Sequence, residues 1–217
     1  MTQRLCHQGS GWTLLSLLPL LLLLGAAPPA PPTKEAATPP HACCAAAPPT
    51  ASRNALPETS LYRMQSVWQD QNGHEMHLSD LAGEVRVVAM IFTHCQYACP
   101  RILQQLRELE QSTMTARPGF VLISFDSARD DPATLKAYAR AQGLDPAHWT
   151  LLHGQPEDVR ALSVVLDVPY QKDAAGNFSH ASVISVLDSE GRVMKQMREL
   201  GGDLDPCREA ILTAGTH

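Results

Sequence analysis

"VRVVAMIFTHCQYACP", residues 85–100, joins an apolar run to a pair of cysteines and a proline. The run over 85–92 is rich in β-branched residues, which is typical of a central strand buried on both faces. The apolar residues after Pro100 are spaced as on one face of a helix: Ile102, Leu103, Leu106 and Leu109. Because proline is tolerated in the first turn of a helix, the sequence places Cys95 and Cys99 at a strand-to-helix turn.

The rest of the domain alternates between strand and helix patterns. Further strands are predicted over 120–126 and 150–154, and helices over about 132–142, 156–168 and 205–213. Two hairpins flank this pattern, one over 66–78 around Asn72-Gly73 and one over 182–197 around Glu190-Gly191. This order predicts an α/β three-layer domain with a central mixed sheet, compatible with a thioredoxin-like fold that has an added N-terminal β-hairpin.

Composition divides the chain into three parts. Residues 12–27, "WTLLSLLPLLLLLGAA", are apolar and are preceded by Arg4, so we interpret 1–27 as an export signal or a membrane anchor, with the anchor favoured. Residues 28–60 are dominated by proline and alanine, which predicts a disordered tether. The folded domain is then expected over 61–217.

The charge pattern excludes one class of partner. The chain has 217 residues, a formal net charge of -5 and no cluster of lysine and arginine. Nucleic-acid binding depends on such clusters for long-range attraction to phosphate. We therefore expect no nucleic acid among the partners. No glycine-rich phosphate loop is present, so nucleotide chemistry is not expected either.

The cysteine turn suits two kinds of chemistry. Backbone N–H groups and the positive end of the helix dipole stabilise a thiolate there, and a thiolate is both a nucleophile and a ligand for soft metals. The spacing of Cys95 and Cys99 favours convergence on an ion but permits a redox-active or structural disulfide. Copper needs a further ligand, for which His180 and His94 are candidates, although the His94 side chain should point away from that of Cys95. The remaining histidines of the domain are expected on the surface: His74, His77, His148 and His153.

Four segments resemble the Sco/SenC family of copper chaperones for cytochrome c oxidase. They are "LAGEVRVVAMIFTHCQYACPRILQQL", "VLISFDSARDDPATLKAYA", "TLLHGQPEDVRALSVVLDVPY" and "FSHASVISVLDSEGRV". The resemblance covers about 61–214 and implies a thioredoxin-like domain, behind a single membrane anchor, that binds Cu(I) or Cu(II). Carried over by position, the copper ligands are Cys95, Cys99 and His180. Asp126 occupies an acidic family position and is expected to support the site without binding metal.

The sequence departs from the family pattern in two places. Gln96-Tyr97 stands where the family commonly has Pro-Asp, and Ser179 stands where it has an Asp before the histidine. Both changes remove a carboxylate near the expected metal, so copper affinity, redox potential and choice of partner are expected to differ from those of typical members. They also make a mainly thiol-redox role more plausible.

Two main hypotheses follow for function. In the first, the chain is a periplasmic chaperone, anchored to the inner membrane, that delivers one copper ion to the CuA centre of an oxidase subunit. In the second, it is a thiol-disulfide oxidoreductase that reduces client cysteines before metallation and works with thiol-redox partner proteins. A redox or copper sensor is a third reading of the same residues. Only the second of these would make the chain an enzyme.

Other soft or acidic groups receive simpler interpretations. The tether contains His41, Cys43 and Cys44. Either these three residues capture copper, or the two cysteines are a readily oxidised pair without a function at the site. Cys207 is predicted to be a lone or semi-buried thiol, and Cys6 to play no part in the site. Met194 and Met197 should face opposite sides of a strand and form no metal site. Asp126, Asp130 and Asp131 are favoured as turn and helix-start residues over a hard-metal site.

Overall fold

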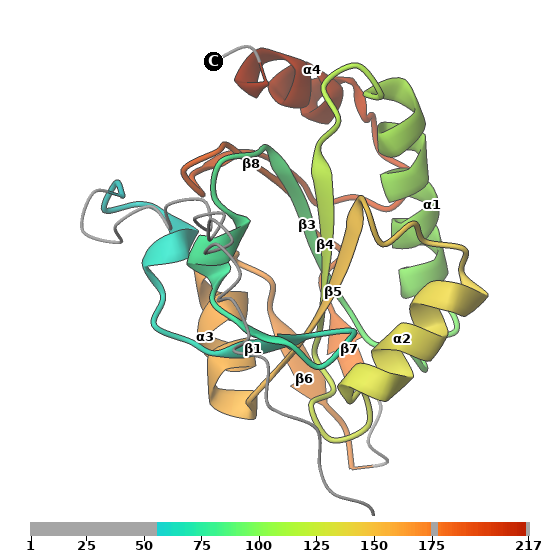
Figure 1. Cartoon of the computed structure of the whole chain (residues 1–217). Helices are drawn as coiled ribbons and strands as arrows, with labels where there is room; N and C mark the ends of the chain where they lie inside the picture. The colour runs from blue at the N-terminus through green and yellow to red at the C-terminus, as the bar shows by residue number, and fades with distance from the viewer. Residues whose placement is uncertain (1–55, 175–177, 216–217) are drawn as a thin grey trace, which may run out of the picture. The chain divides into compact units, whose positions relative to one another are not determined.

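A seven-stranded mixed sheet forms the centre of the domain in the computed structural model (Figure 1). Its order is β2 (Glu75–Met76), β1 (Trp68–Asp70), β5 (Trp149–Gly154), β4 (Gly119–Ser124), β3 (Arg86–Ile91), β8 (Ile184–Leu187) and β9 (Val193–Met197). The pairs of β3 with β4 and of β4 with β5 are parallel, and the other pairs are antiparallel. The predicted mixed sheet is therefore confirmed.

The structure describes residues 56–174 and 178–215. The predictions for the N-terminal export segment, and for Cys6, His41, Cys43 and Cys44, lie outside the described residues. Most of the predicted tether lies outside them too, so the three-part division of the chain stays a prediction. Within the described ranges, no helix combines the length and the apolar character that crossing a membrane requires.

Helices cover both faces of the sheet. α1 (Ala98–Ser112) and α2 (Pro132–Ala141) lie on one side, and α3 (Pro156–Val165) lies on the other (Figure 1). α4 (Asp205–Ala214) packs against β8, β9 and α1. Two short 3-10 helices, Leu61–Arg63 and Leu78–Leu81, complete the N-terminal part. The domain thus has the three layers that the sequence predicts.

β3, which leads into the cysteine turn, is an inner strand of the sheet. It pairs with β4 on one side and with β8 on the other, and its side chains from Val87 to Ile91 are buried. α1 covers it with apolar residues at the spacing read from the sequence: Ile102, Leu103, Leu106 and Leu109. The point where the chain leaves β3 and begins α1 is therefore fixed from both sides.

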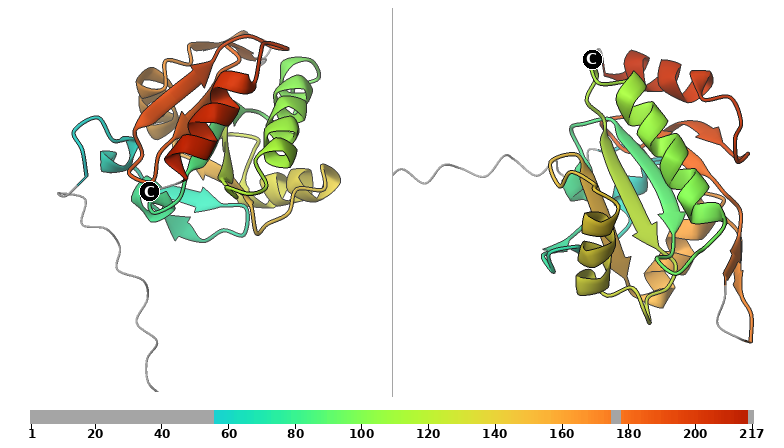
Figure 2. Two further views of the ribbon diagram at one scale, coloured as in Figure 1. Left: turned by 90° about the horizontal axis from the view of Figure 1, so that it is seen from above. Right: turned by 90° about the vertical axis from the view of Figure 1, so that its right-hand side faces the viewer.

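A small antiparallel hairpin lies outside the main sheet and was not predicted. It consists of β6 (Tyr170–Lys172) and β7 (Phe178–His180), with Tyr170 opposite His180 (Figure 1). Figure 2 shows it as a separate ribbon beside the main sheet. His180 is the last residue of β7, so a strand and not a loop carries it. Both strands are short and largely polar, so no alternation of apolar residues marks them in the sequence.

The two C-terminal methionines behave as predicted for a strand. Met194 is 50% exposed, whereas Met197 is buried and its Sδ lies 3.8 Å from the Gln105 Nε2 of α1. The predicted hairpin turn at Glu190-Gly191 joins β8 to β9, and Gly191 has a φ of +82° that favours glycine. Met197 therefore serves the core, and Met194 lies on the surface.

Candidate metal centre

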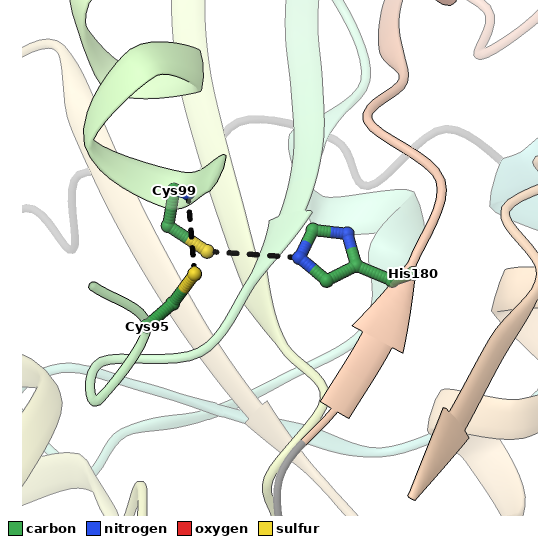
Figure 3. A group of neighbouring side chains, drawn as sticks. All are labelled: Cys95, Cys99 and His180. Carbon is green, nitrogen blue, oxygen red and sulfur yellow. Dashed lines mark hydrogen bonds between the residues drawn. The ribbon is translucent and has the colours of Figure 1, made fainter. Parts of the chain in front are cut away.

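The two cysteines lie on either side of the start of α1. Cys95 is in the turn after β3, where its N–H donates to the Phe92 carbonyl at 3.2 Å. Cys99 is in the first turn of α1, where backbone N–H groups have no partner within the helix. The Cys99 N–H donates to Cys95 Sγ at 3.3 Å, and Figure 3 shows the two sulfurs turned toward each other. Both thiols are free.

The two thiols differ in burial and in acidity. Burial alone would raise the pKa of Cys95, but hydrogen bonds from the backbone of Cys99, Tyr97 and Ala98 outweigh it and lower the pKa. Cys99 is 1% exposed, and burial raises its pKa, as does a thiolate at Cys95. Cys95 is therefore the sulfur that is more readily charged and more accessible, and Cys99 lies behind it.

His180 completes the group from the other side. Its Nε2 lies 3.8 Å from Cys99 Sγ, and its Nδ1 lies 2.9 Å from the Ala181 carbonyl oxygen (Figure 3). Since a carbonyl only accepts, Nδ1 carries the proton and the lone pair of Nε2 faces the sulfurs. Burial lowers the pKa of the ring below 6.5, which keeps it neutral at neutral pH. A neutral ring with Nδ1–H held by a carbonyl is the usual state of a metal-binding histidine.

Aromatic rings from two strand ends hold the imidazole in place. Phe125, directly after β4, has its ring centroid 4.9 Å from that of His180, and Phe92, directly after β3, is at 6.0 Å in an edge contact. Phe125 also packs against Tyr170 of β6 at 4.8 Å, and Phe92 against Phe178 of β7 at 5.2 Å. These contacts dock the hairpin on the ends of the central strands.

The three side chains have the spacing of a metal site. One ligand atom from each of Cys95, Cys99 and His180 lies within 4.8 Å of the other two. Bonds of about 2.0–2.3 Å to nitrogen and sulfur, as in zinc sites, put trigonally arranged ligand atoms roughly 3.5–4 Å apart. Two thiolates and one imidazole are soft and borderline donors, so the set fits copper better than a hard cation.

The other predicted histidines lie outside this group. His94 has a side chain that is 59% exposed, and its Nδ1 contacts Thr93 Oγ1 at 3.1 Å, so it points away from Cys95 as predicted. His74 is exposed, whereas three others are half-buried and not simply solvated: His77, His148 and His153. His153 Nδ1, for example, lies 3.0 Å from the Asp130 carbonyl.

The aspartates of the turn after β4 have three different roles. Asp131 caps α2 by accepting from the Thr134 N–H at 2.7 Å, as predicted. Asp126 is buried and accepts a hydrogen bond from the Arg129 side chain. Its Oδ1 also lies 3.5 Å from Nζ of Lys172 in β6, which makes an ion pair. This ion pair ties the hairpin to the end of β4, which agrees with a supporting role. Sequence reasoning missed Asp130, which is 0% exposed and is more than a turn residue.

Cys207 is remote from this chemistry. It lies in the first turn of α4, is 1% exposed, and has a pKa that burial raises. The prediction of a lone thiol is confirmed, although the side chain is fully buried and not half-buried. Cys207 is therefore a natural control residue for experiments on the other two cysteines.

The fold and the site together define a class of protein: thioredoxin-like domains that carry a Cys-Cys-His group. The family model described as SCO1/SenC matches residues 57–211. The chain belongs to the SCO1/SenC family. A curated relative, the SCO1 protein homolog of Bacillus subtilis, is 26% identical over 136 residues, which are 59% of this chain and 69% of the relative.

Solved structures share the fold. A SCO1/SenC family lipoprotein from Bacillus anthracis has a TM-score of 0.63 and 25% identity, over 68% of this chain and 91% of that one. Bradyrhizobium japonicum ScoI with copper bound has a TM-score of 0.58 and 24% identity, over 69% of this chain and 96% of ScoI. A third structure is that of BsSco, in which a disulfide switch was identified and which is a member of the Sco family of cytochrome c oxidase assembly proteins. It has a TM-score of 0.61 and 22% identity, over 69% of this chain and 91% of BsSco.

Proposed function

We propose that this chain is a copper chaperone that holds one copper ion through Cys95, Cys99 and His180. The observation that carries the proposal is the convergence of two sulfurs and a lone-pair nitrogen within 4.8 Å, from segments 81 residues apart. The copper-bound ScoI neighbour supports the choice of metal. The donor set suits Cu(I), and the borderline imidazole allows Cu(II) as well.

Transfer proceeds by ligand exchange in this proposal. Cys95 is the less buried of the two sulfur ligands, and Cys99 is fully buried. An incoming ligand of the acceptor therefore replaces Cys95 first, and the copper ion passes on without any change of valence. The acceptor is the oxidase subunit that carries a CuA centre, consistent with the description of BsSco as an oxidase assembly protein.

The proposed place of action is the periplasm, at the inner membrane. Its support is the apolar segment 12–27, which has the character of an export signal or anchor. The Bacillus anthracis neighbour is described as a lipoprotein, which agrees with a protein held at a membrane. Membrane fractionation of cells that express the full chain tests this placement, since release into the soluble periplasmic fraction would contradict an anchor.

Copper stoichiometry tests the metal-binding proposal. The purified chain, reduced and loaded under anaerobic conditions, should retain about one copper per chain after gel filtration. The Cys95→Ser/Cys99→Ser variant should retain about one copper per chain less than the wild type, whether or not His41, Cys43 and Cys44 also bind copper. Cys207→Ser is the matched control and should behave as the wild type, because Cys207 is buried elsewhere. Equal copper in all three proteins would defeat the proposal.

A thiol-disulfide oxidoreductase is the second candidate, because the two thiols are arranged unequally. Cys95 has a lowered pKa and is accessible, as an attacking thiol must be, and Cys99 lies directly behind it, as a resolving thiol must. This activity needs no imidazole. Reduction of a peptide disulfide should survive His180→Ala nearly unchanged if it is the main function, whereas copper retention should collapse in the same variant.

A further inference from the structure

Asp130 is a buried carboxylate beside the cysteine turn that the proposed ligand set does not include. Its Oδ2 accepts from the Thr93 N–H at 2.9 Å and from Ser124 Oγ at 2.6 Å. Its Oδ1 accepts from Thr93 Oγ1 at 2.5 Å. All three partners donate, so the group acts as a charged acceptor, and the short O–H···O distances are typical of charge-assisted hydrogen bonds.

These hydrogen bonds fix the turn that presents Cys95. Thr93 lies between Phe92 and Cys95, which close the turn through their own backbone hydrogen bond at 3.2 Å. Ser124 is the last residue of β4, so the carboxylate links the ends of two central strands. Because Thr93 is bonded through both its N–H and its hydroxyl, the backbone leading into Cys95 has little freedom.

The charge of Asp130 also acts on the site. No residue between Cys95 and Cys99 is acidic, so the turn itself supplies no carboxylate. Among the described residues, the ion-pair partner of Asp130 is the exposed His94 ring, with Nδ1 3.9 Å from Oδ1, and that ring is charged only when protonated. The pKa of Cys99 is raised mainly by burial, further by Cys95, and least by the negative charge of Asp130.

We propose that Asp130 is a positioning residue that holds the Cys95 turn and, through its buried negative charge, favours Cu(II) over Cu(I) in the bound state. The inference rests on the proposed copper site. With two thiolates and a neutral imidazole, the Cu(I) form carries one net negative charge and the Cu(II) form carries none. A fixed carboxylate nearby repels the anionic form and leaves the neutral form unaffected to first order.

An Asp130→Asn variant isolates the charge. It keeps the size of the side chain and one accepting oxygen for Thr93 N–H and Ser124 Oγ. Asp131→Asn is the matched control, since it makes the same change at the next residue, whose side chain caps α2 instead. Competition with chromophoric chelators for Cu(I) and Cu(II) should show the Cu(II)-to-Cu(I) affinity ratio falling at least about threefold in Asp130→Asn. Asp131→Asn should keep the wild-type ratio.

Thr93→Val separates position from charge. This variant removes the hydroxyl bond to Oδ1 but keeps the carboxylate and the backbone bond to Oδ2. Its affinities for both valences should fall by the same factor, so their ratio should not move. If Asp130→Asn does not fold, this variant still decides the positioning role, because wild-type affinity for both valences in Thr93→Val would overturn it.

The disulfide equilibrium of Cys95 and Cys99, measured without copper, tests the role of Asp130 independently of the proposed function. Reduced dithiothreitol gives two electrons to the Cys95–Cys99 disulfide, which takes up protons and opens to two thiols, while dithiothreitol closes to its cyclic disulfide. At a pH where Cys95 is a thiolate, loss of the Asp130 charge favours that anion over the neutral disulfide, so Asp130→Asn should be about threefold more reduced at equilibrium than Asp131→Asn. If the wild type binds no copper, the proposed function fails and this result still tests Asp130. Equal disulfide equilibria in wild type, Asp130→Asn and Asp131→Asn would overturn the role of its charge.

Discussion

The two halves of the candidate copper site are built in different ways. The cysteine half is local in sequence: two thiols four positions apart lie between a central strand and the helix that covers it. The histidine half comes from a hairpin of two three-residue strands outside the main sheet. Backbone ladders fix the first half, whereas side-chain packing on Phe92 and Phe125 fixes the second. The sulfurs therefore have a rigid frame, and the imidazole depends on its neighbours.

The sharpest test of this comparison removes the histidine half alone. His180→Ala leaves both sulfurs in place but takes away the third ligand. Copper affinity should fall by more than about 100-fold, because the loss of a ligand should cost more than the loss of a residue that only hydrogen-bonds a ligand, which costs up to about 100-fold. His148→Ala, a half-buried histidine elsewhere, should leave the affinity unchanged. Chelator competition measures both, and equal affinities in the two variants would remove His180 from the site.

The packing of the hairpin gives the next effect. Phe125→Leu keeps an apolar side chain but loses the ring that contacts His180 and Tyr170. Stability should fall by about 1–2 kcal/mol, and copper affinity by about tenfold. Phe120→Leu is the control, since Phe120 lies in β4, the strand that Phe125 follows, but stacks on Trp149 at 4.6 Å. Urea unfolding should show similar losses for both variants, with copper affinity reduced only in Phe125→Leu.

Within the cysteine half, the two thiols should react at different rates. In the reduced, metal-free chain, iodoacetamide should modify Cys95 at least about fivefold faster than Cys99, which is buried and less acidic. Because the pKa of Cys95 lies below 9.0, its rate should stop rising with pH earlier than that of an ordinary thiol. The Cys99 rate should still be rising there. Peptide mapping by mass spectrometry distinguishes the two sites, and equal rates would contradict the unequal pair.

The ion pair between hairpin and sheet gives the smallest effect. Lys172 lies over the Phe178 ring at 4.9 Å and pairs with Asp126, but its side chain is 45% exposed. Solvent screens such a pair, so Lys172→Ala should cost only about 0.5 kcal/mol and reduce copper affinity about twofold. Thermal unfolding and chelator competition measure the two quantities. A loss as large as that of Phe125→Leu would mean that charge, and not ring packing, holds the hairpin.

The sequence predicts the cysteine half far better than the histidine half. A β-branched run, a proline and a helical spacing of leucines lie within about one strand and one helix, so local rules place Cys95 and Cys99. Nothing local links them to His180, which is 81 residues beyond Cys99: the residues alone left it as a candidate beside His94, and the family resemblance singled it out. The segment of β6 and β7 is short and polar, so its strands form on the aromatic surface that the rest of the fold provides.

The acidic turn shows a second limit of sequence reasoning. Asp126, Asp130 and Asp131 have the same chemistry and lie close together, so composition assigns them one role. The fold gives each a different environment, because only Asp131 remains at the surface as a helix cap. Asp130 is buried beside the neighbouring ends of the parallel strands β3 and β4, where it bonds Thr93 and Ser124, and that depends on strand order, not on residue type.

An ion held at this site would join two sheets that share no backbone hydrogen-bond ladder. Its binding free energy would then add to the docking of the hairpin, as any ligand stabilises the state that binds it. Resistance of β6 and β7 to proteolysis should accordingly report whether the cargo is present. A recipient protein that contacts this hairpin would have a direct way to tell a loaded carrier from an empty one.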